Sequence, residues 1–136
     1  MRNIVIIDDK DHALEQVIFE FPGVEKNDIA FRHFDTMAEF RRQAPGDLFL
    51  VFLDFFLSKD RDYGTSLIPE IRCEHLVCFS SMREMSDHMC RIAGDAGKDR
   101  IRNVYSVRKL KDTIANDELQ AVLRDIFSTS PLGDRT

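Results

Sequence analysis

Two unbroken apolar runs constrain this chain more than any other feature of its sequence. One is Ile4–Ile7, and the other extends from Leu48 to Leu53. Neither run alternates with polar residues, as a strand with one solvated face would. Runs of this kind are typical of strands that are covered on both faces, as in the parallel sheet of an α/β domain. We therefore expect a parallel sheet with helices packed on both of its faces.

Strand and helix patterns alternate along the whole chain. Strand patterns lie at 4–7, 29–34, 48–53, 76–79 and 103–107, and helical periodicity follows each of them. Five such units with right-handed crossovers predict a doubly wound, flavodoxin-like α/β fold with a five-stranded parallel sheet in the order 2-1-3-4-5. The 136 residues suit one domain, which we expect at 1–127, followed by a flexible tail at 128–136.

Local signals predict where several helices begin. Thr36 and Ser81 are each followed three residues later by Glu, which is the spacing of a capping box, so a helix is expected after each. A short helix is expected at 65–72, provided that Pro69 lies in its first turn, where a missing N–H does no harm.

Acidic residues mark the ends of two predicted strands. Asp8 and Asp9 close the first strand, and Asp54 follows the third. In the order 2-1-3-4-5 these strands flank the topological switch point, where α/β sheets bind ligands. Burial of an unpaired carboxylate costs several kcal/mol, and three carboxylates together repel one another unless a cation lies between them. Oxygen ligands of this kind suit Mg²⁺, so the sequence predicts a magnesium site here.

Two further polar residues complete this edge of the sheet. Ser80 ends the fourth predicted strand, and Lys109 follows the fifth. Acids, a hydroxyl and an ammonium group together support phosphoryl transfer, in which cations neutralise the phosphoryl oxygens and a carboxylate is the nucleophile.

These motifs, in this order, resemble the receiver domain of bacterial two-component response regulators over about residues 2–127. The resemblance implies that Asp54 is the phospho-acceptor and that Ser80 is the hydroxyl that turns towards the phosphoryl group. It also implies that Lys109 pairs with the phosphoryl oxygens.

The resemblance further implies a set of metal ligands and partners. Asp8 and Asp9 would bind Mg²⁺ with Asp54, Asp9 being favoured over Asp8 as the direct ligand, and the backbone carbonyl of Phe56 would be a further ligand. A sensor histidine kinase or phosphotransfer protein would supply the phosphoryl group, and a separate output protein would recognise the surface that phosphorylation changes. A homodimer through the last helix stays an open alternative, although the core needs the same apolar residues.

Some residues differ from the family pattern. Leu110 follows Lys109 where the family has proline, and Tyr105 stands one place from the usual aromatic position. A register shift of one residue would direct Arg108 at the site instead of Lys109. Bulky Phe56 and polar Ser81 could hinder the approach of a phosphodonor.

These departures leave two other functions open. One is a receiver that no longer accepts phosphate and acts as a docking module. The other is a magnesium-dependent phosphohydrolase of the haloacid dehalogenase kind, which would need a second acid where Phe56 stands. The favoured function is that of a phospho-acceptor rather than an enzyme acting on a separate substrate.

Composition argues against several other classes of protein. The net charge of −5, from 24 acids and 19 bases, disfavours a nucleic-acid binder. The three cysteines form no C-x-x-C pair, so a zinc finger and a disulfide framework are not expected, and Cys78 is predicted as a core residue. No apolar stretch reaches the length of a membrane span, and a cytoplasmic location is expected. Asp60 and Asp62 are predicted to be solvated loop acids.

Overall fold

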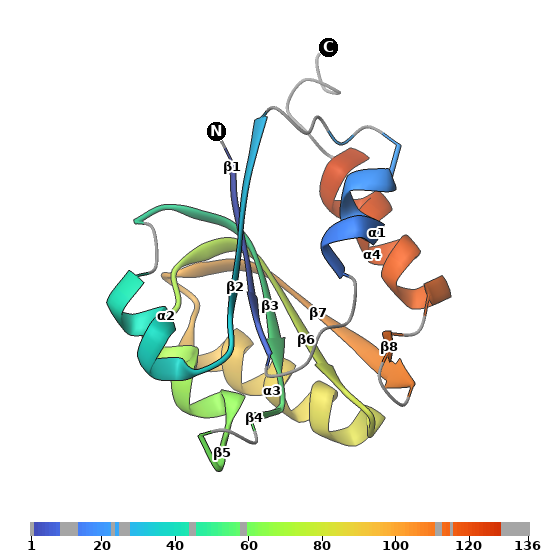
Figure 1. The fold of residues 1–136 in the computed structure, drawn as a ribbon. Helices are drawn as coiled ribbons and strands as arrows, with labels where there is room; N and C mark the ends of the chain where they lie inside the picture. Colours follow the sequence, from blue (N-terminus) through green and yellow to red (C-terminus); the bar gives the residue numbers. More distant parts are fainter. Residues whose placement is uncertain are drawn as a thin grey trace.

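In the computed structural model, residues 2–8, 14–22, 24, 28–43, 46–57, 60–110, 113–114 and 116–128 are described. Within these residues, five parallel strands form the central sheet (Figure 1): β1 Arg2–Ile7, β2 Ile29–Phe34, β3 Leu48–Asp54, β6 Cys73–Ser80 and β7 Ile101–Leu110. Their order in space is β2-β1-β3-β6-β7, and a short strand, β8 Thr113–Ile114, pairs antiparallel with β7. The predicted five-stranded sheet and its order are confirmed.

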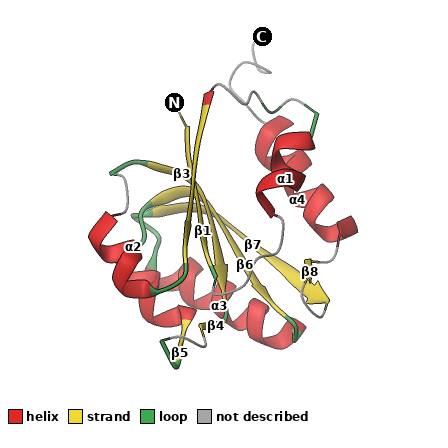
Figure 2. Ribbon diagram, in the orientation of Figure 1, coloured by secondary structure: helices red, strands yellow, loops and turns green. Residues whose placement is uncertain are grey.

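Helices cover both faces of the sheet (Figure 2). On one face lie α1 Leu14–Glu20 and α4 Asn116–Ser128. The other face carries α2 Met37–Gln43, the 3₁₀ helix η2 Gly64–Glu70 and α3 Arg83–Ala96. Burial on both faces is what the two unbroken apolar runs require.

The side chains of the central strands divide between two hydrophobic cores. In β1, Val5 and Ile7 pack in the core beneath α2, η2 and α3, while Ile4 and Ile6 pack in the core beneath α1 and α4. All four are buried. This division follows from the alternation of side chains along a strand, which sends successive residues to opposite faces.

A small hairpin follows the end of β3. Its strands are β4 Phe56–Leu57 and β5 Asp62–Tyr63, which pair antiparallel. Arg61 in the connecting turn has a φ of 51°, in the left-handed region that residues with a Cβ seldom adopt. The segment predicted as a plain polar loop is therefore partly a hairpin held close to the sheet.

Of the local predictions, those for residues 65–72 and for Ser81 are corrected, and that for Thr36 is confirmed. The segment predicted as a helix at 65–72 is a 3₁₀ helix, and Pro69 is its next-to-last residue rather than part of its first turn. Thr36 does cap α2, because its hydroxyl accepts a hydrogen bond from Glu39 N at 3.2 Å. Ser81 does not cap α3, whose N-cap is Met82 without a side-chain hydrogen bond.

The fifth strand of the sheet is also longer than predicted. A strand was expected at 103–107, but β7 has ten residues and pairs along β6 and then with β8. Lys109 therefore lies within this strand and not after it.

Candidate functional site at the carboxyl ends of the strands

Two of the three predicted acids lie side by side at the carboxyl edge of the sheet. Ile7 of β1 is in register with Leu53 of β3, so Asp8 and Asp54 are the next residues on adjacent strands. Adjacent strands are about 4.8 Å apart. Asp8 is 0% exposed and Asp54 is 4% exposed. Two carboxylates buried on adjacent strands repel each other, so this edge favours a cation.

Backbone hydrogen bonds hold the Asp8 side of this edge in place. Asp8 N donates to Phe34 O at 3.1 Å, and the ring Nε2 of His33 lies 2.7 Å from Asp8 O. Both contacts come from β2, so the neighbouring strand fixes the chain at the point where β1 ends.

On the Asp54 side of this edge, the backbone of Gly64 lies close to the end of β3. Gly64 N donates to Phe55 O at 2.6 Å, and a Cβ at position 64 would lie 2.2 Å from the backbone oxygen of Asp54. No side chain fits into that distance, so only glycine allows η2 to begin against the end of β3. The role of Gly64 is therefore to allow the close approach of two backbone segments.

Ser80 lies at the same edge. It ends β6 and is 6% exposed, and its predecessor Phe79 is in register with Asp54. The Ser80 hydroxyl oxygen accepts a hydrogen bond from Met82 N at 3.2 Å. The serine is therefore one residue beyond the level of Asp54 on the adjacent strand, and its hydroxyl contacts the chain that leads into α3.

The end of β7 brings two basic residues towards this edge. Arg108 is in register with Ser80, its side chain is exposed, and its backbone N–H donates to Glu118 Oε1 at 3.0 Å. The guanidinium of Arg83, in the first turn of α3, pairs with the same Glu118. Lys109 pairs through its backbone with Ile114, and its side chain lies outside the described part of the structure, so its role stays a prediction.

The other two predicted metal ligands are Asp9 and the backbone carbonyl of Phe56. Asp9 lies outside the described residues. Phe56 is the first residue of β4, and its ring is 47% exposed and 5.7 Å from the ring of Tyr63, measured between centroids. The assignment of its carbonyl to a metal stays a prediction.

The described residues contain two of the carboxylates that a metal site at this edge would need. They contain no group of three His, Cys, Asp or Glu side chains arranged around one point, and Asp9 is not among them. Asp8 and Asp54 nevertheless are two buried carboxylates on adjacent strands, which is the donor chemistry that a hard divalent cation prefers. The residues present therefore fit such a cation.

The prediction that Asp60 and Asp62 are solvated loop acids is confirmed for Asp62, which is exposed, but not for Asp60. Asp60 is half-buried, and its Oδ2 accepts a hydrogen bond at 3.0 Å from Met37 N, the first residue of α2. Asp62 accepts hydrogen bonds from Tyr63 N at 2.7 Å and from the Ser66 hydroxyl at 3.1 Å. Both acids stabilise the chain around the hairpin.

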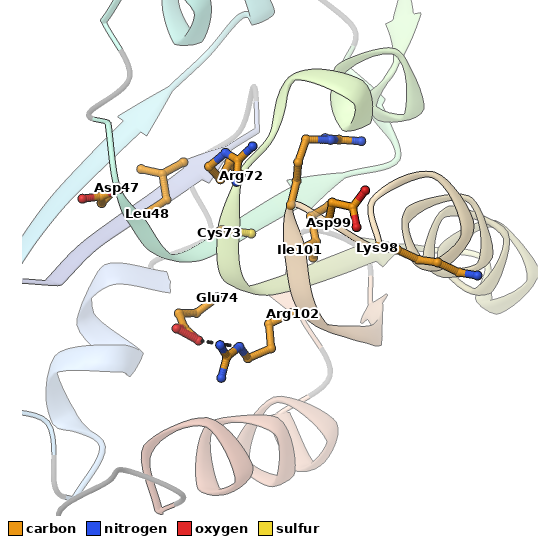
Figure 3. Close-up of a pocket in the computed structure, with 10 residues that line it drawn as sticks. Asp47, Leu48, Arg72, Cys73, Glu74, Lys98, Asp99, Ile101 and Arg102 are labelled. Carbon is orange, nitrogen blue, oxygen red and sulfur yellow. Dashed lines mark ion pairs between the residues drawn. The ribbon is translucent and has the colours of Figure 1, made fainter.

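A cavity of about 550 Å³ lies at the opposite, amino-terminal edge of the sheet (Figure 3). It is formed where β3, β6 and β7 begin, and charged residues of both signs line it. Arg102 and Glu74 form an exposed ion pair there at 3.3 Å. Arg100 is used structurally, since its guanidinium donates to the carbonyls of Ile68 and Ile71 at 2.8 Å.

A buried histidine lies close to this second edge. His75 is 7% exposed, lies 3.3 Å from the amide of Asn103, and packs edge-on against Phe49 with ring centroids 5.1 Å apart. Burial lowers the pKa of His75, and this outweighs the opposing effect of nearby carboxylates. The neighbouring Tyr105 donates to Asp125 of α4 at 2.5 Å, and burial followed by this hydrogen bond raises the pKa of Tyr105.

Comparisons with known proteins place the fold. No family model matches the sequence, and neither does any curated protein. A crystal structure of a response regulator protein from Burkholderia pseudomallei, with a phosphorylated aspartic acid, a calcium ion and citrate, superposes with a TM-score of 0.53. The match covers 100% of this chain and 76% of that chain at 17% identity. The chain thus has the fold of a response-regulator receiver domain. Within its described residues, no helix has the length and apolar character needed to cross a membrane.

Proposed function

We propose that this chain is a phospho-accepting receiver domain of a two-component system and that Asp54 accepts the phosphoryl group. The observation that carries the proposal is the burial of Asp54 and Asp8 at neighbouring strand ends of a receiver fold. A hydrophobic core gains nothing from two adjacent carboxylates. The calcium ion and phosphorylated aspartic acid described for the structural neighbour support the proposal by analogy.

The acids would prepare Asp54 for attack. The groups that would hold Mg²⁺ are the carboxylates of Asp8, Asp9 and Asp54 and the backbone carbonyl of Phe56. When bound, the cation neutralises charge on the phosphoryl oxygens. Asp54 would then attack phosphorus as the nucleophile while the bond from phosphorus to the donor breaks, and the imidazole of a phosphohistidine, or acetate from acetyl phosphate, would leave. The close approach of Gly64 to the Asp54 backbone would hold the end of β3 in position.

The proposed switch runs from Ser80 to α3 and α4. On phosphorylation, the Ser80 hydroxyl gives up its contact with Met82 N and donates to a phosphoryl oxygen, while Lys109 pairs with the phosphoryl group. The start of α3 follows Ser80 directly. Because Arg83 and the backbone of Arg108 share Glu118, a shift of α3 is transmitted to β7 and α4. This is a population shift between two packings.

The proposed partners are a sensor histidine kinase or phosphotransfer protein and a separate output protein. Three large apolar side chains are exposed at or near the carboxyl edge: Phe56 at 47%, Tyr63 at 50% and Met82 at 53%. Exposed apolar groups around a reactive centre suit the docking of a phosphodonor protein. The domain would act as a phospho-acceptor and would turn over its own phosphoryl group only.

Phosphorylation with a small donor tests the proposal. The protein is incubated with Mg²⁺ and acetyl phosphate and then analysed by intact mass and peptide mapping. We expect one added phosphoryl group, mapped to Asp54, that disappears in Asp54→Asn and persists in Asp47→Asn. Asp47 precedes β3 at the opposite edge and is exposed, so it is a matched acid outside the site. An unchanged mass in the wild-type protein would refute the proposal.

A second candidate function is a docking module that does not depend on phosphorylation. The exposed rings of Phe56 and Tyr63, in contact at the mouth of the site, favour it. In that case acetyl phosphate leaves the mass unchanged, and the Phe56→Ala variant loses partner binding while Asp54→Asn retains it. Turnover of a generic phosphate ester, absent in Asp54→Asn, would instead support the phosphohydrolase.

A further inference from the structure

The surface between α3 and the sheet contains a cluster of small polar and sulfur-containing side chains. Cys78 of β6 and Ser106 of β7 are cross-strand neighbours. Ser106 donates from its hydroxyl to Asp87 at 2.6 Å and lies 2.8 Å from the hydroxyl of Ser86, both on α3. These contacts fix the face of α3 that lies over Cys78.

Cys90 lies on that same face of α3. It is four residues after Ser86, so the two side chains are neighbours along the helix. Cys78 is fully buried in the core beneath α3, and Cys90 is half-buried and packs against that core. The two side chains thus share the layer between α3 and β6 and are close enough that each shifts the pKa of the other, and all three cysteines of the chain are free thiols. A half-buried thiol is therefore paired with a buried one.

The geometry points to Cys78 and Cys90 as a redox-active thiol pair that a peroxide converts into an intramolecular disulfide. Cys90 is the thiol that reacts first, because it is the one that solvent reaches. Cys78 is the resolving thiol, because it is in contact with Cys90 and shielded from solvent. Cytosolic disulfides are usually of this transient, regulatory kind rather than structural staples.

The chemistry balances with hydrogen peroxide as the oxidant. The Cys90 thiolate attacks one peroxide oxygen, the O–O bond breaks, and the released hydroxide takes up a proton as water, which leaves a sulfenic acid. The Cys78 sulfur then attacks the Cys90 sulfur, the S–O bond breaks, and the Cys78 proton leaves with the hydroxyl as a second water. Two thiols lose two electrons, and one peroxide is reduced to two waters.

The electrostatics of the pair support this division of roles. The interaction with Cys78 lowers the pKa of Cys90 despite its partial burial and the nearby Asp87. The hydrogen bond with Cys90, together with burial, raises the pKa of Cys78. A thiol with a lowered pKa and some access to solvent is the one that peroxides oxidise.

Cys73 provides an internal control. It is buried at the first position of β6, and desolvation raises its pKa to about 12. A peroxide should therefore leave it as a thiol. The three cysteines thus predict one reactive thiol, one resolving thiol and one inert thiol.

The test is peroxide treatment of the reduced wild-type protein, followed by mass spectrometry and peptide mapping. We expect the loss of two hydrogens, a Cys78–Cys90 cross-linked peptide, recovery by dithiothreitol and a free thiol at Cys73. The wild-type readout requires no substitution, so a variant that fails to fold does not weaken it. Three intact thiols, a bridge to Cys73, or oxidation of Cys90 to sulfinic acid without a cross-link would overturn the inference.

Variants then separate the two roles. Cys78→Ser should stop at the Cys90 sulfenic acid, which dimedone traps, and Cys90→Ser should give no cross-link and no trapped adduct. Cys73→Ser should behave like the wild type. Equal dimedone labelling of all three variants would also overturn the assignment of roles.

The cross-link would fasten α3 to β6 two residues before Ser80. Oxidation would therefore hinder the movement of α3 that the switch requires, a consequence that rests on the proposed function. The cross-link itself does not, because peroxide mapping reports it whether or not Asp54 accepts phosphate. If peroxide forms the cross-link equally in the phosphorylated and the unphosphorylated protein, the proposed switch fails but the thiol pair stands.

Discussion

Charged residues lie at both ends of the central strands, but they are buried at one end and exposed at the other. At the carboxyl ends, Asp8 and Asp54 are buried on adjacent strands. At the amino ends, Glu74 pairs with Arg102, and both side chains remain largely in solvent, 45% and 75% exposed. An exposed ion pair costs little and contributes little, whereas a buried pair of like charges is costly without a ligand. Burial rather than charge therefore distinguishes the candidate site from the charged cavity.

The largest expected difference between the two ends concerns two glycines that flank β3. In Gly64→Ala the new Cβ would lie 2.2 Å from Asp54 O, a backbone atom that cannot move without the strand. We expect the free energy of unfolding to fall by about 3 kcal/mol, measured by urea denaturation.

Gly46 is the matched control at the start of β3, because no atom lies within 4 Å of a Cβ at that position. Gly46→Ala should change the free energy of unfolding by less than about 0.5 kcal/mol. Equal effects of the two substitutions would show that the close approach at Asp54 does not determine the stability of this edge.

The next effect concerns the paired acids. Without divalent cations, Asp54→Asn should raise the free energy of unfolding by about 1 kcal/mol, because it removes the repulsion with Asp8. Added Mg²⁺ should raise the melting temperature of the wild type and have less effect on the variant. Thermal melts with and without Mg²⁺ measure both effects.

Asp47→Asn is the control for this pair at the opposite end of β3. Asp47 is exposed, and its backbone oxygen accepts the bond from Asn3, so its carboxylate contributes little to the fold. Its melting curve and its response to Mg²⁺ should match the wild type. A wild-type protein that Mg²⁺ does not stabilise would argue against a cation at the acidic edge.

A smaller effect depends on pH and arises near the amino edge. Burial lowers the pKa of His75 below that of the unfolded chain, about 6.5, so the unfolded state takes up this proton first as the pH falls. The contribution of His75 to stability is thus unchanged above about pH 6.5 and is lost as the pH falls below it.

The His75→Gln variant isolates this contribution. Urea denaturation at about pH 7.5 and about pH 5.5 should show a smaller loss of stability on acidification in the variant than in the wild type. An identical pH dependence in both proteins would mean that His75 is as easily protonated in the folded state as in the unfolded chain.

The smallest effect is expected at the exposed ion pair. Arg102→Ala should lower the free energy of unfolding by less than about 0.5 kcal/mol, and the difference should shrink in high salt. Denaturation at low and high ionic strength measures it. A loss of several kcal/mol that salt does not reduce would contradict the view that charge at this edge is solvated.

Local patterns in the sequence predicted most of the fold because they report burial directly. The apolar runs ending at Ile7 and Leu53 could only be strands covered on both faces, and the acids after them had to share an edge in a sheet of this order. The capping residue Thr36 was identified because its hydrogen bond spans only three residues. These inferences need no knowledge of distant contacts.

Predictions failed where a distant segment supplied the partner. Asp60 reads as a loop acid, yet it binds the start of α2, 23 residues away. The strand β7 extends beyond its apolar core because β6 and β8 pair with its ends. Ser81 has the spacing of a capping residue, but α3 begins two residues later.

Hydrophobic periodicity is local, so the sequence was enough to predict that strands and helices alternate, that the sheet is parallel, and that acids follow its first and third strands. Other contacts became apparent only from the packing of the elements: Gly64 lies against the backbone of Asp54, and Cys78 lies near Cys90. Those contacts join residues far apart in the chain or on different elements, and their distances depend on how helices pack on the sheet. The chemistry of the thiol pair, unlike that of the acids at the strand ends, could therefore be assigned only from the fold.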